Sequence, residues 1–205
     1  MIKRIFVEKK RTVSNLADNL CRELNLQLKV SIGSLRCFIR YDIEGLEGDD
    51  FNTAIGTVFS EPPVDDVYFE NLPALTGYTV FEVEYLPGQY DLRADSAVQC
   101  VQLLTMGTLP KIRCATVYAV SGAVDETAVP DIQKIQNYLV NPVDSRIASN
   151  EKPASLTQKI LSPENVKKIA GFRSFDKTQM QTFRAQYALA MSLDDVQFVQ
   201  QYFAA

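Results

Sequence analysis

Two stretches of sequence decide the fold, LRCFIRYDIEG at residues 35–45 and IRCATVYAVSG at residues 112–122. Arginine, cysteine, tyrosine and glycine recur in them at a constant offset of 77 residues. Apolar side chains alternate along both stretches, which predicts two strands that each turn one face to a core. A proline-valine-aspartate sequence follows each strand, at residues 63–65 and 142–144, an offset of 79. The chain is therefore expected to be an internal duplication.

The neighbouring segments give each half the order strand, helix, strand, helix. We expect strands at 2–7, 35–43, 79–86 and 111–120, a short edge strand at 67–69, and helices at 13–24, 50–59, 131–140 and from about 91. Because side chains alternate along a strand, strand 79–86 should bury Phe81, Val83 and Tyr85. Glu82 and Glu84 should then lie on a solvated or interdomain face.

These elements predict an α+β fold in two domains. Residues 1–147, with halves at about 1–72 and 78–147, should pack as a pseudo-dimer whose antiparallel or mixed sheets are covered by helices. Residues 148–205 should form a polar linker and then short helices, one of which starts at Ser162 and ends near Gly171. This tail is too short for a core of its own, so its apolar faces need another surface.

The composition excludes several classes of protein. A net charge of −4 and an isoelectric point near 5.0 argue against nucleic-acid binding. No apolar run is long enough to span a bilayer, and residues 2–10 do not resemble a signal peptide, so we expect a cytoplasmic protein without a membrane partner. The chain has no histidine, the commonest general base and metal ligand, and its four cysteines form no C-x-x-C pair. We expect buried free thiols, and no catalytic, cofactor-binding or metal-ligating residue.

Candidate contact residues gather where the loop after strand 79–86 enters a helix. They are Gln89, Asp91, Arg93 and Asp95. We interpret them as an interdomain contact. Two alternatives remain open, a plain helix cap with Asp91 as the N-cap and direct binding of a phosphate or carboxylate. Arg36 and Arg113 occupy equivalent positions in the two repeats and are expected at a solvated or interface position, with a paired anion site as the alternative.

The helical tail carries a second set of candidates, Phe183, Tyr187 and Tyr202. Large apolar groups left in water form a patch that soluble monomers seldom tolerate. We therefore expect this face to contact another domain or a second copy of the chain.

Residues 81–97, FEVEYLPGQYDLRADSA, resemble a signature of the N-terminal region of formylglycinamide ribonucleotide amidotransferase, also called phosphoribosylformylglycinamidine synthase. The resemblance covers essentially the whole chain. It includes MIKRIFVEKK at 1–10, FSEPPVD at 59–65, NPVDSR at 141–146, EKP at 151–153 and LAMSLDD at 189–195. The chain looks most like the long single-chain form of that enzyme.

The resemblance implies both a fold and a role. In that family the N-terminal domain mimics a dimer of the small PurS-type subunit, and a helical linker domain, ATP-dependent synthetase domains and a glutaminase follow it. The enzyme is a carbon–nitrogen ligase of purine biosynthesis that uses glutamine, ATP and Mg to convert formylglycinamide ribonucleotide to formylglycinamidine ribonucleotide. Its catalytic groups would lie beyond residue 205.

By this resemblance the chain is a non-catalytic scaffold and docking fragment that is inactive alone. Its partners would be the synthetase and glutaminase domains of the same longer chain. The fold class by itself leaves an alternative, a free-standing α+β ligand-binding or regulatory module, because duplicated sheets also form small-molecule clefts.

Overall fold

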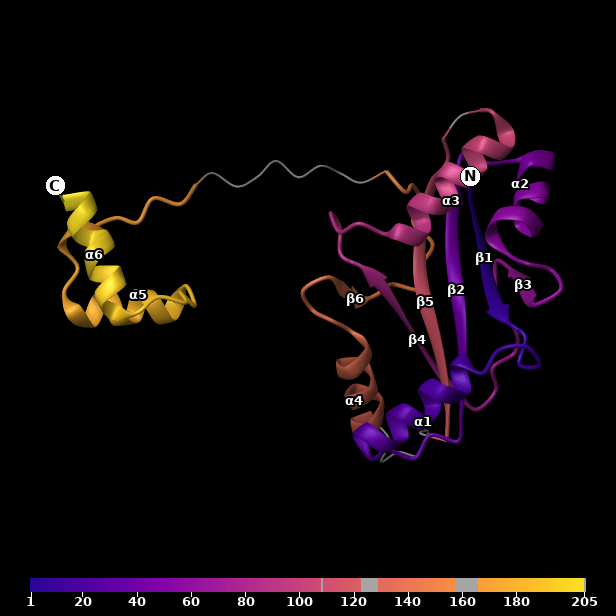
Figure 1. Cartoon of the computed structure of the whole chain (residues 1–205), viewed down its shortest axis with the longest axis horizontal. Helices are drawn as coiled ribbons and strands as arrows, with labels where there is room; N and C mark the ends of the chain where they lie inside the picture. Colours follow the sequence, from indigo (N-terminus) through magenta and orange to yellow (C-terminus); the bar gives the residue numbers. More distant parts are fainter. Residues whose placement is uncertain (108, 123–128, 158–165, 205) are drawn as a thin grey trace. The chain divides into compact units, whose positions relative to one another are not determined.

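A computed structural model describes residues 1–107, 109–122, 129–157 and 166–204. They belong to two compact units, Met1–Lys159 and Ile160–Ala205, and each unit is described by itself. The predicted α+β class is confirmed, because the first unit is an antiparallel sheet with helices on one face (Figure 1). No helix in the described part of the chain is long and apolar enough to cross a membrane.

The elements of the first unit follow the predicted order with boundaries shifted by a few residues, except that β6 was not predicted. The strands are β1 Ile2–Lys9, β2 Ser34–Glu44, β3 Asp65–Phe69, β4 Tyr78–Tyr85, β5 Lys111–Ser121 and β6 Ser145–Ile147. The helices of the first unit are α1 Leu16–Leu28, α2 Gly48–Ala54 with a π-helical turn at Ile55–Phe59, α3 Leu92–Thr105 and α4 Val129–Leu139. The second unit contains a 3₁₀ turn at Phe172–Ser174, α5 Lys177–Gln186 and α6 Leu193–Ala204.

The strands form one antiparallel sheet in the order β3-β1-β2-β5-β4-β6, where more than one sheet or mixed pairing was allowed for (Figure 1). The first three positions come from the first half of the chain and the last three from the second half. The two stretches that carry the sequence repeat, β2 and β5, lie side by side at the centre.

The strand pairing is two-fold symmetric about the pair Ile39–Thr116. These two residues are opposite each other in β2 and β5 and are also 77 positions apart, so each is the counterpart of the other. Strand β1 pairs with β2 as β4 pairs with β5, and corresponding residues of β1 and β4 are 76 positions apart. The helix ends also repeat, because Lys29 and Met106, at φ 54° and 53°, end α1 and α3 in the left-handed conformation.

The turn that leads to each edge strand corrects one predicted offset. Val64 donates its N–H to Glu61 O, and Asp144 donates its N–H to Asn141 O, so the structural offset is 80 where the letters suggested 79. The chain partners agree, because Lys10 N–H bonds Val64 O and Leu86 N–H bonds Asp144 O. The first turn holds two prolines where the second holds one, and matching letters selected the wrong proline.

Two helix pairs cover one face of the sheet (Figure 1). Helices α1 and α4 lie over one end, where Leu24, Leu35, Phe81, Val120 and Ile135 are buried. Helices α2 and α3 lie over the other end, where Ile5, Tyr41, Ile43, Phe59 and Val101 are buried. Two of the predicted strand residues, Phe81 and Val83, face this core, while Tyr85 is half exposed at the end of its strand.

Irregular segments in place of helices cover the opposite face. Buried Phe6, Phe38 and Val117 pack there against the segment that contains Leu72 and Leu75. Residues 148–157, which were expected to be a linker, also lie on this unit. Side chains of β1 and β2 hold their backbone, and the unit therefore runs to Lys159 instead of ending at 147.

The second unit has a small core of its own, contrary to expectation. Asp176 and Gln179 form a reciprocal capping box that starts α5, and Met180 and Val196 are buried between the helices. The structure shows no helix at residues 166–170, and the predicted helix start at Ser162 lies outside the described residues.

Candidate functional site

The start of α3 positions the first group of candidate residues. Asp91 caps the helix, since its Oδ1 accepts the N–H of Ala94 at 3.0 Å. Its Oδ2 accepts the N–H of Cys114 at 3.3 Å, so the same carboxylate also fastens α3 to β5. Asp95 accepts the Tyr90 hydroxyl at 2.6 Å on the exposed surface. Gln89 is exposed in the preceding turn.

Arg93 has a partner that the sequence analysis did not anticipate. Its side chain, although exposed to solvent, interacts with the hydroxyl of Tyr41 on β2, and this interaction helps to raise the pKa of Arg93 against the opposing effect of burial. The structure thus brings Asp91 and Arg93 to the sheet and leaves Gln89 and Asp95 at the surface.

Asp91 and Arg93 line a pocket of the first unit. Its volume is about 730 Å³, within the range of small-molecule sites. It lies on the helix-covered face over the Ile39–Thr116 pair, between the N-terminal half of α3 and the loop that follows α4. Tyr41 and Cys114 form part of its floor.

The thiol and the phenols of this pocket are not suited to acid–base work near neutral pH. Burial raises the pKa of Tyr41, raises that of Tyr118 to about 12, and raises that of the Cys114 thiol well above its usual value. A thiol or phenol with a raised pKa stays protonated and is a poor nucleophile. The lining also includes the carboxylates of Glu84, Asp91 and Asp144, of which Asp91 is already engaged by the N–H groups of Ala94 and Cys114.

The cysteines are all free, and they differ in burial. Cys114 is buried, Cys21 and Cys37 are partly buried, and Cys100 on α3 is exposed. The expectation of four buried thiols is wrong for Cys100, which lies off the buried stripe formed by Ala97 and Val101.

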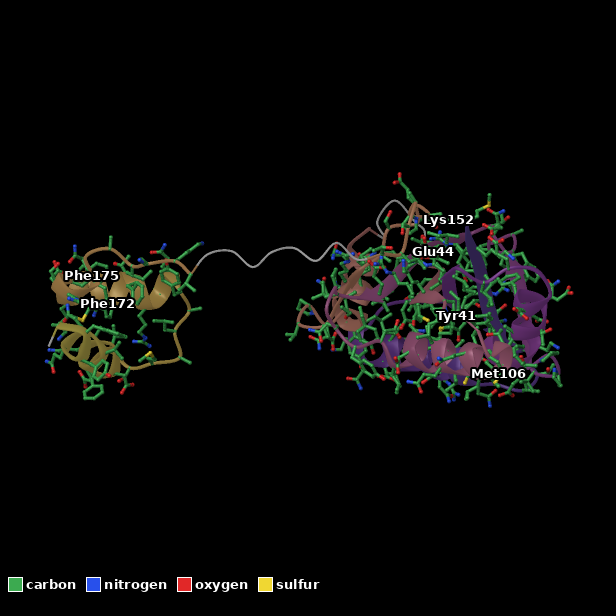
Figure 2. The ribbon with its side chains drawn as sticks, turned by 90° about the horizontal axis from the view of Figure 1, so that it is seen from above. Tyr41, Glu44, Met106, Lys152, Phe172 and Phe175 are labelled. Atoms are coloured by element: carbon green, nitrogen blue, oxygen red, sulfur yellow. The ribbon has the colours of Figure 1, made fainter. Side chains whose placement is uncertain are left out.

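The second unit holds the other candidates around an aromatic cluster. The rings of Phe172, Phe175, Phe183 and Tyr187 pack with centroids 4.9 to 5.9 Å apart, and Figure 2 shows Phe172 and Phe175 close together. Gln200 of α6 donates to Phe172 O and Phe175 O, which holds this helix against the cluster. Tyr202 lies apart and is 73% exposed. Phe183 and Tyr187 therefore support the unit, while Tyr202 is free for contact.

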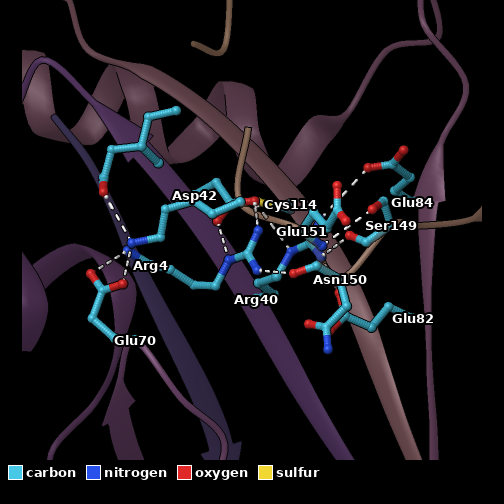
Figure 3. A network of polar contacts seen from close by, with 12 residues as sticks. Arg4, Arg40, Asp42, Glu70, Glu82, Glu84, Cys114, Ser149, Asn150 and Glu151 are labelled. Carbon is cyan, nitrogen blue, oxygen red and sulfur yellow. Dashed lines mark hydrogen bonds and ion pairs between the residues drawn. The ribbon is translucent and has the colours of Figure 1, made fainter. Parts of the chain in front are cut away.

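A buried ionic network crosses the sheet face opposite the helices (Figure 3). Arg4 on β1 donates to both oxygens of Asp42 on β2, from Nε at 2.5 Å and from Nη2 at 3.0 Å. Asp42 Oδ2 also lies 3.3 Å from Arg40 Nε. All three side chains are almost completely buried. An ionised group in such a place needs a partner, because its desolvation is costly.

The network continues along the same face of the sheet toward β4 and β6. Arg40 forms an ion pair with Glu82 on β4 and lies 3.7 Å from Glu84 Oε2. Glu84 Oε1 accepts Nε and Nη2 of Arg146 on β6 at 2.9 and 2.7 Å. Burial raises the pKa of Glu82 although Arg40 opposes the shift. Glu82 and Glu84 are thus buried, and the expected solvated or interdomain face is wrong, because arginines of β2 and β6 neutralise them within the unit.

Backbone carbonyls of residues 149–150 complete the network. Ser149 O accepts Arg40 Nη1 at 3.1 Å, and Asn150 O accepts Arg4 Nη1 at 2.8 Å (Figure 3). Lys152 forms an ion pair with Glu70. The sequence alone did not predict this ionic network. The available signal was the placement of arginine and aspartate two positions apart in a central strand, Arg40 and Asp42, where both must share one face.

Comparison with known proteins adds no relative. No protein-family model matches the chain, and no curated protein matches it. The resemblance to formylglycinamide ribonucleotide amidotransferase stays a prediction. Among the described residues, no group of three or more carboxylate, thiol or imidazole side chains is arranged to hold a metal ion.

Proposed function

We propose that this chain is the N-terminal scaffold and docking part of a formylglycinamide ribonucleotide amidotransferase, and that it acts in the cytoplasm. The observation that carries the proposal is the repetition of strand order, register and helix ends about the Ile39–Thr116 pair. A pseudo-dimer of a small subunit would have this symmetry. The resemblance of the sequence supplies the family, and the symmetry is the feature that the family leads us to expect.

A non-catalytic role agrees with the chemistry of the described side chains. The chain has no histidine, and the phenols and the thiol among the residues that line the pocket beside α3 have raised pKa values. The amidation that uses glutamine, ATP and Mg would take place in synthetase and glutaminase domains that follow in a longer chain. Residues 1–205 would hold those domains in position.

The exposed aromatic side of α6 is the surface best suited to docking. Phe198, Tyr202 and Phe203 are 70%, 73% and 53% exposed. Phe198 and Tyr202 are four residues apart and lie on one side of the helix. Three large rings on one short helix form an apolar patch that a neighbouring domain would cover.

Replacing Tyr202 with aspartate should weaken binding of the chain to a separately produced synthetase–glutaminase portion by about tenfold or more, since burying a large apolar side chain contributes about 1.5–3 kcal/mol. Calorimetric titration measures the affinity. The matched control is Gln197→Asp, which adds the same charge to an exposed position of α6 on the side away from Tyr202. Phe183→Asp is unsuitable, because Phe183 supports the aromatic cluster.

Equal affinities for the wild type and Tyr202→Asp would remove α6 from the docking surface. Sedimentation of the isolated chain tests whether a second copy of the chain covers this patch instead. If Tyr202→Asp abolishes a dimer of residues 1–205 and leaves the titration unchanged, the patch is covered by a second copy.

The pocket of about 730 Å³ favours a second candidate function, a free-standing module that binds or senses a small molecule. The length of the reading frame separates the two. The docking proposal expects coding sequence for the synthetase part beyond codon 205, whereas a stop codon there would favour the ligand-binding module.

A further inference from the structure

Arg113 on β5 carries a charge that its surroundings leave unmatched. Its direct cross-strand neighbour is Asp42, the partner that strand pairing would give it. Both oxygens of Asp42 already accept hydrogen bonds from Arg4, and Arg40 lies beside them. Arg113 is half-buried, and it forms no hydrogen bond or ion pair with the described residues.

The repeat shows how a compensated arginine looks at the same position. Arg36, the counterpart of Arg113 at an offset of 77, donates to both oxygens of Glu8 at 2.8 and 2.5 Å. The counterpart of Glu8 in β4 is Glu84, at an offset of 76, and Glu84 binds Arg146 instead. In the second half of the repeat, the glutamate pairs with Arg146, and Arg113 is left without an acidic partner among the described residues.

Arg113 faces a pocket with further donors. The pocket has a volume of about 360 Å³ and is also lined by Arg40, Arg146 and Ser149. Arg40 is 2% exposed, and its Nε forms no hydrogen bond within the described residues, although it lies 3.3 Å from Asp42 Oδ2. Arg146 uses Nε and Nη2 for Glu84 and remains half exposed. The side chains of three arginines therefore line one space, and Arg113 is the one of them without an acidic partner among the described residues.

The acidic residues of the pocket differ in how far they are neutralised. Asp42 and Glu84 are held by arginines. Glu151 is exposed, and its carboxylate forms no ion pair among the described residues. It is a local competitor for Arg113 that an incoming anion would displace.

We infer that this pocket binds a phosphate group, either as free phosphate or as a phosphate monoester. Guanidinium groups bind phosphate oxygens through paired N–H donors, and a tetrahedral dianion can engage several arginines at once, whereas a planar carboxylate engages one fork. The volume admits the phosphate with a small ester substituent. The site is independent of the docking surface on α6.

The test is a titration of the whole chain with inorganic phosphate, followed by backbone amide NMR at constant ionic strength with chloride as the reference salt. Saturable shifts are expected at Arg113, Arg146 and residues 149–151. Arg113→Gln should weaken the affinity by at least about tenfold, the loss expected for charge-assisted hydrogen bonds. Glu151→Gln should tighten it several-fold, and Arg36→Gln, the matched control, should leave it unchanged.

Parallel titrations with methyl phosphate and acetate define the ligand. Binding of methyl phosphate as tight as that of phosphate assigns the site to esters, and its exclusion assigns the site to free phosphate. The inference is overturned if phosphate gives no saturable shift beyond chloride, if acetate binds as tightly as phosphate, or if Arg113→Gln titrates like the wild type. The amide spectrum of each variant reports whether it is folded, and Glu151→Gln changes only an exposed side chain.

Discussion

Replacing Asp42 with asparagine should lower the free energy of unfolding of the first unit by about 3–5 kcal/mol, the cost of removing one partner from a buried ion pair. Asparagine keeps the shape of the side chain and removes its charge. Arg4 and Arg40 would then both lose the carboxylate that they share. Urea denaturation followed by far-ultraviolet circular dichroism measures the change.

Asp66→Asn is the control for Asp42→Asn. Asp66 on β3 is half exposed and lies 3.9 Å from Lys10 Nζ, and such surface pairs contribute about 0–1 kcal/mol. If both variants lost less than about 1 kcal/mol, the network on this face of the sheet would not be the stabilising element that its burial indicates.

Replacing Gly122 with alanine should destabilise the first unit by about 2–5 kcal/mol, and more than the same change at Gly45. Both glycines have positive φ, +83° and +88°, which alanine adopts only with strain. A Cβ at Gly122 would meet the backbone nitrogen of Gly33 at 2.7 Å, so the strand ends must separate.

Gly45 is the counterpart of Gly122 in the repeat and isolates the effect of backbone strain. A Cβ there has its nearest neighbour at 3.9 Å, the Cα of Pro110, which stands where the first half has Gly33. Gly45→Ala should therefore cost only about 1–2 kcal/mol. Thermal unfolding of the two variants side by side measures the difference, and equal losses would contradict the close approach of Gly122 to Gly33.

Periodicity and repeated residues were sufficient to predict strands β1 to β5, but not β6 or the order of the strands in the sheet. The strands at 35–43 and 112–120 were placed correctly because alternation is strong in both and glycines end them. Of the alternatives left open for Asp91, the structure confirms the N-cap, which is a common role for an aspartate before a helical pattern. These features depend on local sequence, which a single chain displays directly.

Features that depend on pairing between distant strands could not be predicted. Glu82 and Glu84 look like solvated carboxylates until Arg40 and Arg146 are known to lie opposite them. Residues 148–157 have the composition of a linker, and the arginines that bind their carbonyls come from β1 and β2, over a hundred residues earlier. Polarity of a segment does not reveal whether its partner is water or a buried charge.

The docking account is tested most directly by turnover of formylglycinamide ribonucleotide. A protein that comprises only the residues beyond 205 is expected to form little formylglycinamidine ribonucleotide from glutamine and ATP, and residues 1–205 alone are expected to form none. Mixing the two should restore the reaction in a saturable manner, with a one-to-one end point. A portion beyond 205 that is fully active alone, or one that residues 1–205 neither bind nor stimulate, would contradict the account.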